Sequence, residues 1–160
     1  MTIIRALLAG LAAALFATGA AHAGPTLDAI KSRGSLRCAV NTGLQGFAAP
    51  DSQGRWSGID VDFCRALAAA ILGDPAKVEF RPTNTQNRFT TLQTGEVDVL
   101  SHNTTWSASR DSALGIVFAG VLFYDGQGFM VPKSLGVRGA HELDGATVCI
   151  LPGTTTELNL

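Results

Sequence analysis

Short apolar runs alternate with amphipathic stretches along the middle of the chain, and this alternation limits the fold more than any other feature. Apolar runs at 36–40, 78–80 and 97–100 predict strands, and helical spacing of apolar positions predicts helices over 60–72 and 88–94. The order strand, helix, strand, helix, strand is typical of an α/β sheet with parallel neighbours. Ligands of such sheets bind beyond the carboxyl ends of the strands, so a site is expected in the loops there.

The helix predicted over 60–72 has boundary signals at both ends. Asp60 is expected to cap its first turn, and Gly73 with the proline that follows is expected to end it. The apolar positions that fall on its one core-facing side are Phe63, Cys64, Leu67, Ala68 and Ile71.

Two further apolar runs, 128–131 and 146–151, predict two more strands. Only a short stretch follows the last of them, which is too little to bury a core of its own. We therefore expect a first α/β ligand-binding lobe over 24–131 and the start of a second, incomplete lobe over 132–160.

Residues 1–23 have the features of a secretory signal peptide. Arg5 is their only charged residue, an almost unbroken apolar run covers 6–21, and Ala-His-Ala at 21–23 has the pattern of a signal peptidase site. A bilayer span takes about 20 residues, so the run is short for a membrane anchor. Cleavage and export to the periplasm are expected.

Composition and missing motifs exclude several classes of function. Hydrophobic residues make up 46% and charged residues 16%, unlike a disordered chain, and the net charge of −1 gives no electrostatic basis for binding nucleic acid. The sequence has no nucleophile elbow, phosphate loop, dinucleotide-binding glycine motif or metal-ligand cluster. Neither a cofactor, a metal nor a catalytic residue is expected.

The three cysteines leave their oxidation state open. Cys38 lies on the first predicted strand and Cys64 on the core face of the next helix, so a disulfide between them is feasible. Buried free thiols agree with the same pattern. Cys149 has no obvious partner in this sequence.

A dense polar cluster at 103–111 follows the strand predicted at 97–100. Arg110 offers parallel N–H donors that match a carboxylate, and neighbouring threonine and asparagine side chains can satisfy the remaining lone pairs. The alternative is a surface ion pair of Arg110 with Asp111 or Asp98.

Two other segments are less specific indications of anion binding. Thr154 and Thr155 begin a predicted helix, where free N–H groups favour negative charge, although ordinary capping with Glu157 explains them as well. Thr85 and Arg88 lie after another strand, where Arg88 could also be a solvated helix residue.

Five segments together resemble the family 3 extracellular solute-binding proteins, the periplasmic amino-acid receptors of ABC importers, and their general L-amino-acid-binding branch in particular. The segments that carry the resemblance are 58–71, 92–100, 103–111, 123–129 and 153–157. The resemblance implies a type II periplasmic binding protein fold, in which two lobes, each with a mixed sheet flanked by helices, close on a ligand between them.

The resemblance also implies roles at the ligand's acid end. Arg110 would grip the α-carboxylate, with Thr105 and Asn103 helping from the same loop. Thr154 and Thr155 would contact that carboxylate from across the cleft.

Side-chain recognition is implied for another set of residues. Arg88 corresponds to an arginine that reads acidic side chains, and Thr85 lies beside it, while Leu44 and Phe47 match positions along the ligand's apolar flank. Members of the family continue past residue 160, where the acidic residue that holds the ligand's ammonium group is expected.

The implied function is that of a monomeric substrate-binding component, which captures free L-amino acids, including those with acidic or amide side chains, and delivers them to an ABC permease. Two alternatives remain at this point. One is a cyclohexadienyl or arogenate dehydratase on the same fold, for which His102 and Asp98 are the candidate acid and base. The other is a fragment that binds weakly or not at all.

Overall fold

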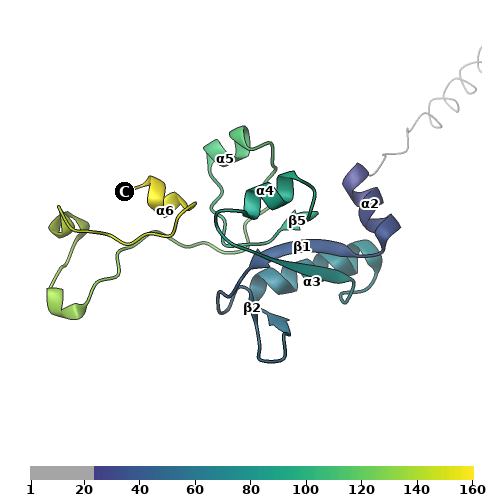
Figure 1. Ribbon diagram of the computed structural model, residues 1–160, viewed down its shortest axis with the longest axis horizontal. Coiled ribbons are helices and arrows are strands. Elements are labelled where there is room, and N and C mark those ends of the chain that lie inside the picture. Colours follow the sequence, from purple (N-terminus) through teal and green to yellow (C-terminus); the bar gives the residue numbers. More distant parts are fainter. Residues whose placement is uncertain (1–23) are drawn as a thin grey trace, which may run out of the picture.

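The computed structural model describes residues 24–160, so the predicted signal peptide at 1–23 lies outside the described residues. Its centre is a three-stranded sheet in the order β4-β1-β5, with β1 (Leu36–Asn41) between β4 (Val78–Thr83) and β5 (Val99–Leu100) (Figure 1). Both pairings are parallel, as the alternation of elements predicts. The resemblance implied a mixed sheet; within residues 24–160, antiparallel pairing lies outside this central sheet, in a separate small hairpin of β2 (Ala49–Pro50) with β3 (Trp56–Ser57) and in an isolated bridge between Leu44 and Ala48.

Four helices accompany the sheet: α2 (Pro25–Arg33), α3 (Ile59–Leu72), α4 (Arg88–Gln93) and α5 (Ala108–Ala113). The helix α3 runs along β1 and ends at Gly73 in the left-handed conformation, as predicted (Figure 1). None of the helices in the described part of the chain is long and apolar enough to cross a bilayer.

The start of α3 corrects the prediction that Asp60 caps it. Gly58 is the N-cap, and the backbone N–H groups of Ile59 and Asp60 donate to the carbonyl oxygens of Gly46 and Phe47 instead. These loop carbonyls satisfy the free donors, so no side-chain cap is needed. Gly58 has φ +123°, and a Cβ there would lie 2.2 Å from the Phe47 carbonyl oxygen, which explains the glycine.

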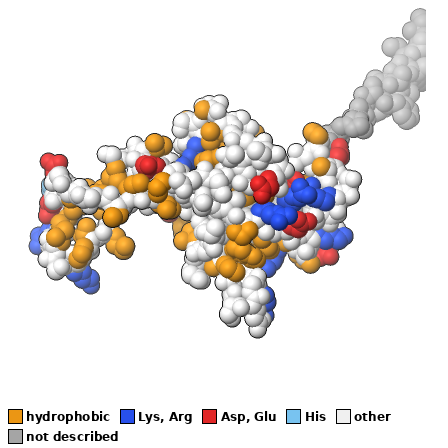
Figure 2. Space-filling view, in the orientation of Figure 1, with side chains coloured by type: hydrophobic (Ala, Val, Ile, Leu, Met, Phe, Trp, Pro, Cys, Tyr) orange, Lys and Arg blue, Asp and Glu red, His pale blue; other side chains and the backbone are white. Residues whose placement is uncertain are grey.

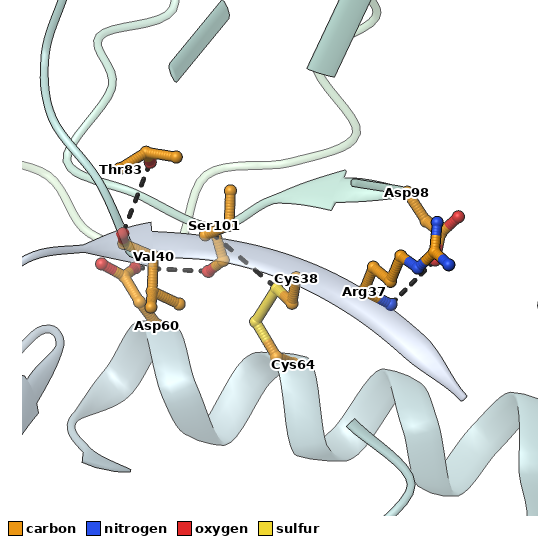
Figure 3. Close-up of a disulfide and its surroundings, with 9 residues drawn as sticks. Arg37, Cys38, Val40, Asp60, Cys64, Thr83, Asp98 and Ser101 are labelled. Carbon is orange, nitrogen blue, oxygen red and sulfur yellow. Dashed lines mark hydrogen bonds between the residues drawn. A yellow bond between two sulfur atoms is a disulfide. The ribbon is translucent and has the colours of Figure 1, made fainter. Parts of the chain in front are cut away.

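The core lies between β1 and α3 and contains a disulfide. Cys38 and Cys64 are fully buried and bonded to each other, which decides between the two states that the sequence left open (Figure 3). Val40, Ala48 and Val61 pack around the bridge without solvent exposure.

Residues 114–154 contain no strand, so the strands predicted at 128–131 and 146–151 are wrong. Two 3₁₀ turns, η1 (Lys133–Leu135) and η2 (Ala140–Leu143), interrupt an extended path away from the sheet (Figure 1). A strand exists only through hydrogen bonds to a neighbouring strand, and the described residues provide none beside these runs. Phe129, Met130, Val148 and Leu151 of these runs are accordingly exposed, and hydrophobic side chains are visible on the surface of this extended part of the chain (Figure 2).

The short helix α6 (Thr155–Leu158) begins where the capping box predicts it. Thr154 Oγ1 accepts from the Glu157 N–H at 3.3 Å, and the Glu157 carboxylate accepts from the Gly153 N–H at 2.8 Å. The cap places residues 152–155 next to the loops that follow β4 and β5.

Candidate functional site

Two buried arginines lie beyond the carboxyl ends of the strands. Arg88 is the first residue of α4, which follows β4, and Arg110 lies in α5, which follows β5. Arg88 is 1% exposed and Arg110 is 8% exposed. The alternative of a solvated Arg88 is therefore wrong, and so is that of a surface ion pair for Arg110.

Carbonyl oxygens from three loop residues hold the two guanidinium groups. Arg110 donates to the Thr105 carbonyl at 2.9 Å, and Arg88 donates to the Asn103 carbonyl at 3.1 Å. Both arginines also donate through Nη2 to the Gly153 carbonyl, at 3.1 Å from Arg88 and 3.4 Å from Arg110. One backbone oxygen thus joins the two arginines to the C-terminal segment.

Neither guanidinium has a carboxylate partner within residues 24–160. Asp98, an alternative partner of Arg110, is bound by Arg33 and by the Arg37 backbone N–H at the opposite end of β1 (Figure 3). Burial and, second, repulsion from Arg110 lower the pKa of Arg88 to about 10, and burial lowers the pKa of Arg110. Both remain cations at neutral pH, so the cluster is an uncompensated positive site that favours an anion.

Hydroxyl groups of several threonines connect the same loops through hydrogen bonds. Thr85 Oγ1 donates to the Pro152 carbonyl at 2.7 Å, and the hydroxyls of Thr105 and Thr155 lie 3.1 Å apart. Thr154 instead donates to the Leu151 carbonyl at 2.7 Å while it caps α6. Its capping role is therefore confirmed, whereas Thr85, Thr105 and Thr155 gather around the arginine pair.

The other predicted ligand residues lie at the margin of this cluster. The exposed Asn103 side chain accepts from Asn41 at 3.0 Å. Leu44 forms an isolated bridge with Ala48. Phe47 meets Phe123 edge-to-face with ring centroids 5.1 Å apart. The aromatic contact joins the loop after β1 to the segment that follows α5.

Sequence reasoning missed two residues of the cluster. Gly153 has φ +77°, and a Cβ there would lie 2.7 Å from the Thr85 carbonyl oxygen, so only glycine lets the backbone approach this closely. Phe89 lies beneath both arginines, with its ring centroid 5.0 Å from Arg88 Cζ and 5.2 Å from Arg110 Cζ. The Pro-Gly pair after a predicted strand was the available signal for a close turn, but Phe89 looks like an ordinary core residue in the sequence.

The two residues considered as an acid and base for a dehydratase are not arranged for such a role. Asp98 lies at the far end of the sheet (Figure 3). His102 is 9% exposed, and its Nε2 lies 3.2 Å from the Thr83 carbonyl, which is inside the protein.

We expect His102 to make the protein less stable as the pH falls from about 6.5 to about 4. Burial lowers its pKa to about 4, whereas an unfolded histidine titrates near about 6.5. In this interval the unfolded state binds the additional proton, so acid favours unfolding. Urea titrations at several pH values should show a shallower pH dependence for His102→Gln. Burial raises the pKa of Asp60, which favours the folded state as the pH falls. This effect is the same in the unmodified protein and in His102→Gln. Equal slopes would contradict the assignment.

Comparisons with known proteins show which family the chain resembles. The sequence pattern of the bacterial extracellular solute-binding proteins of family 3 matches residues 36–143. The chain is 58% identical over 155 residues to the general L-amino acid-binding periplasmic protein of Rhizobium johnstonii, covering 96% of this chain and 46% of that protein. It is 56% identical to the glutamate/glutamine/aspartate/asparagine-binding protein of Rhodobacter capsulatus, covering 97% of this chain and 46% of that one.

A solved structure extends the likeness to three dimensions. A periplasmic binding protein of an ABC transporter from Brucella ovis, with glutathione bound, superimposes with a TM-score of 0.80 at 58% identity. The match covers 86% of this chain and 43% of that one. The chain thus spans about half the length of the curated relatives it matches, which are 46% covered.

Proposed function

The chain belongs to the bacterial extracellular solute-binding proteins of family 3, and on that premise we propose that the whole protein captures free L-amino acids in the periplasm for an ABC importer. It would bind them as a monomer between two lobes, of which residues 24–131 form the first and 132–160 begin the second. It would then present the closed form to the membrane permease. This function is binding and delivery, without a chemical step.

One observation carries the proposal: two buried guanidinium groups lie side by side without an acidic partner in the described chain. Buried cations are normally paired, because an unpaired charge loses its hydration. A ligand carboxylate would restore the pairing with short charge-assisted hydrogen bonds. A free amino acid offers such a group whatever its side chain is, which agrees with a general receptor.

The names of the relatives indicate that their ligands have one feature in common, the free α-carboxylate and α-amino group of an amino acid. The Rhizobium protein is named for general L-amino acids, and the Rhodobacter protein for acidic and amide amino acids. The Brucella structure holds glutathione, whose γ-glutamyl residue keeps a free α-carboxylate and α-amino group. A site that recognises this end accommodates all of them.

We assign Arg110 to the α-carboxylate, together with Thr105 and Asn103 of the same loop. Among residues 24–160, two N–H groups of the Arg110 guanidinium donate to protein acceptors, which leaves donors for a ligand. Thr155 and Thr154 would approach the carboxylate from the second lobe. The 3.1 Å contact between the hydroxyls of Thr105 and Thr155 supports this for Thr155.

The side chain of the ligand would meet a different group of residues. Arg88, with Thr85 beside it, is proposed to pair with an acidic side chain, and Leu44 and Phe47 are proposed to line the apolar flank. Closure would be driven by contacts that only the closed form makes, of the kind that joins Thr85 to Pro152.

Replacing Arg88 by alanine should weaken binding of acidic amino acids by about tenfold and leave small neutral ones within about threefold. The reason is that only an acidic side chain would form the charge-assisted bond with this guanidinium. Calorimetric titration of the purified protein with L-glutamate and L-alanine measures both effects. Arg81→Ala, which removes an exposed arginine of β4 paired with Glu79, is the matched control. Equal losses for both ligands would refute the side-chain role.

The proposed function itself is tested by titrating the purified protein with a panel of L-amino acids and with D-glutamate as the stereochemical control. Saturable binding of several L-amino acids is expected. Failure to bind any of them would contradict the proposal. Incubation with arogenate or prephenate should give no dehydration product. Turnover of either compound would show that the protein is an enzyme and would contradict the proposed receptor function.

A further inference from the structure

We propose that Phe89 is a positioning residue, whose ring holds the guanidinium groups of Arg88 and Arg110 together at the ligand site. The inference rests on the proposed function, because it explains how a receptor can keep two like charges ready for a carboxylate. It assigns a role to a side chain that the sequence marks only as a core residue.

The geometry places both cations at one aromatic ring. Phe89 is the second residue of α4 and is half-buried. The Cζ atoms of Arg88 and Arg110 lie 5.0 Å and 5.2 Å from its ring centroid. Both distances are within the range of about 6 Å in which a cation is attracted to the face of an aromatic ring.

Two neighbouring buried cations repel one another, and this pair lacks the carboxylate partner that buried cations normally have. No carboxylate between residues 24 and 160 pairs with either arginine. The carbonyl oxygens of Asn103, Thr105 and Gly153 offset part of the charge from one side. The negative face of the Phe89 ring also offsets part of this positive charge. The ring adds no formal negative charge that would compete with an anionic ligand.

The choice of an aromatic ring over an acid has a functional consequence. A carboxylate at this position would neutralise the arginines and reduce their attraction for a ligand. The ring fixes the guanidinium groups and leaves them without a formal negative partner, so they still attract an anionic ligand. Phe89 thereby pre-organises the site, so that less side-chain freedom is lost when the ligand binds.

The test replaces Phe89 in the full chain and measures the affinity for L-glutamate by calorimetry. Phe89→Leu keeps an apolar side chain of similar reach but removes the ring, and about tenfold weaker binding is expected. Phe89→Tyr should restore affinity to within about threefold, because it keeps the aromatic face. Thermal unfolding of each variant serves as the control for folding.

Site-specific fluorinated phenylalanines at position 89 separate positioning from packing. Successive fluorine atoms weaken the attraction of the ring for cations with little change in its shape. Affinity for L-glutamate should therefore fall progressively through the mono-, di- and trifluoro forms, whereas a purely structural role predicts no such trend. A flat series in a protein that binds L-glutamate would overturn the inference.

A measurement without ligand distinguishes failure of this inference from failure of the proposed function. In Phe89→Leu the side-chain NMR resonances of both Arg88 and Arg110 should shift, because both lose the ring current. Unchanged Arg110 resonances would overturn the positioning role. If the unmodified protein bound no amino acid, the proposed function would fail, while these resonances would still decide whether Phe89 holds the pair.

Discussion

Replacing Arg110 by alanine is expected to weaken the binding of every amino acid by about 100-fold or more, since each hydrogen bond to a charged group contributes about 1.5–3 kcal/mol. Arg110 is 8% exposed, and its guanidinium is held by the carbonyls of Thr105 and Gly153 and unpaired with any acid in the described chain. A ligand carboxylate would thus make its main charge-assisted contact here, irrespective of the ligand's side chain. Calorimetry with acidic, amide and neutral amino acids measures the loss.

The conservative variant and a surface control sharpen this prediction. Arg110→Lys keeps the charge but loses the paired donors, so it should recover only part of the affinity. Arg55→Ala removes an arginine whose side chain is 73% exposed in the turn before β3, and it should bind like the unmodified protein. Binding by Arg110→Ala within threefold of normal for all ligands would remove Arg110 from the site.

Removing the disulfide with Cys38→Ala and Cys64→Ala together should lower the free energy of unfolding by about 3–4 kcal/mol, because the bridge closes a sequence separation of 26 residues. The bond connects β1 with α3 at the centre of the core (Figure 3), so its loss frees the unfolded chain and also loosens packing around Val40 and Val61. Urea unfolding monitored by circular dichroism gives the free energies.

Two controls isolate the bridge from other effects of the substitutions. Cys149→Ser changes an exposed free cysteine and should leave stability within about 0.5 kcal/mol of normal. A reducing agent should destabilise the unmodified protein and have no effect on the double variant. If reduction left the unmodified protein equally stable, the contribution assigned to the disulfide would be wrong.

Local patterns were sufficient to predict the first part of the fold. The parallel strands β1, β4 and β5 and the helices between them follow from periodicity and from stop signals such as Gly73. The start of α3 was mispredicted because its free N–H groups are satisfied by the carbonyls of Gly46 and Phe47. A side-chain cap can be recognised in a sequence, whereas a backbone acceptor from another loop cannot.

The later segments show where local patterns fail. The runs at 128–131 and 146–151 have the composition of strands, but strand formation depends on a neighbour and not on composition alone. At the site, Arg110 and Thr105 are close in sequence, and their contact could be anticipated. The approach of Gly153 to Arg88 joins residues 65 positions apart and follows only from the folded chain.

The role of Arg110 in ligand binding is tested most directly by a crystal structure of the protein grown with L-glutamate. We expect the α-carboxylate to lie within about 3 Å of the Arg110 guanidinium nitrogens, with the Thr105 hydroxyl also in contact. A glutamate bound elsewhere, with Arg110 still donating only to the carbonyls of Thr105 and Gly153, would contradict it.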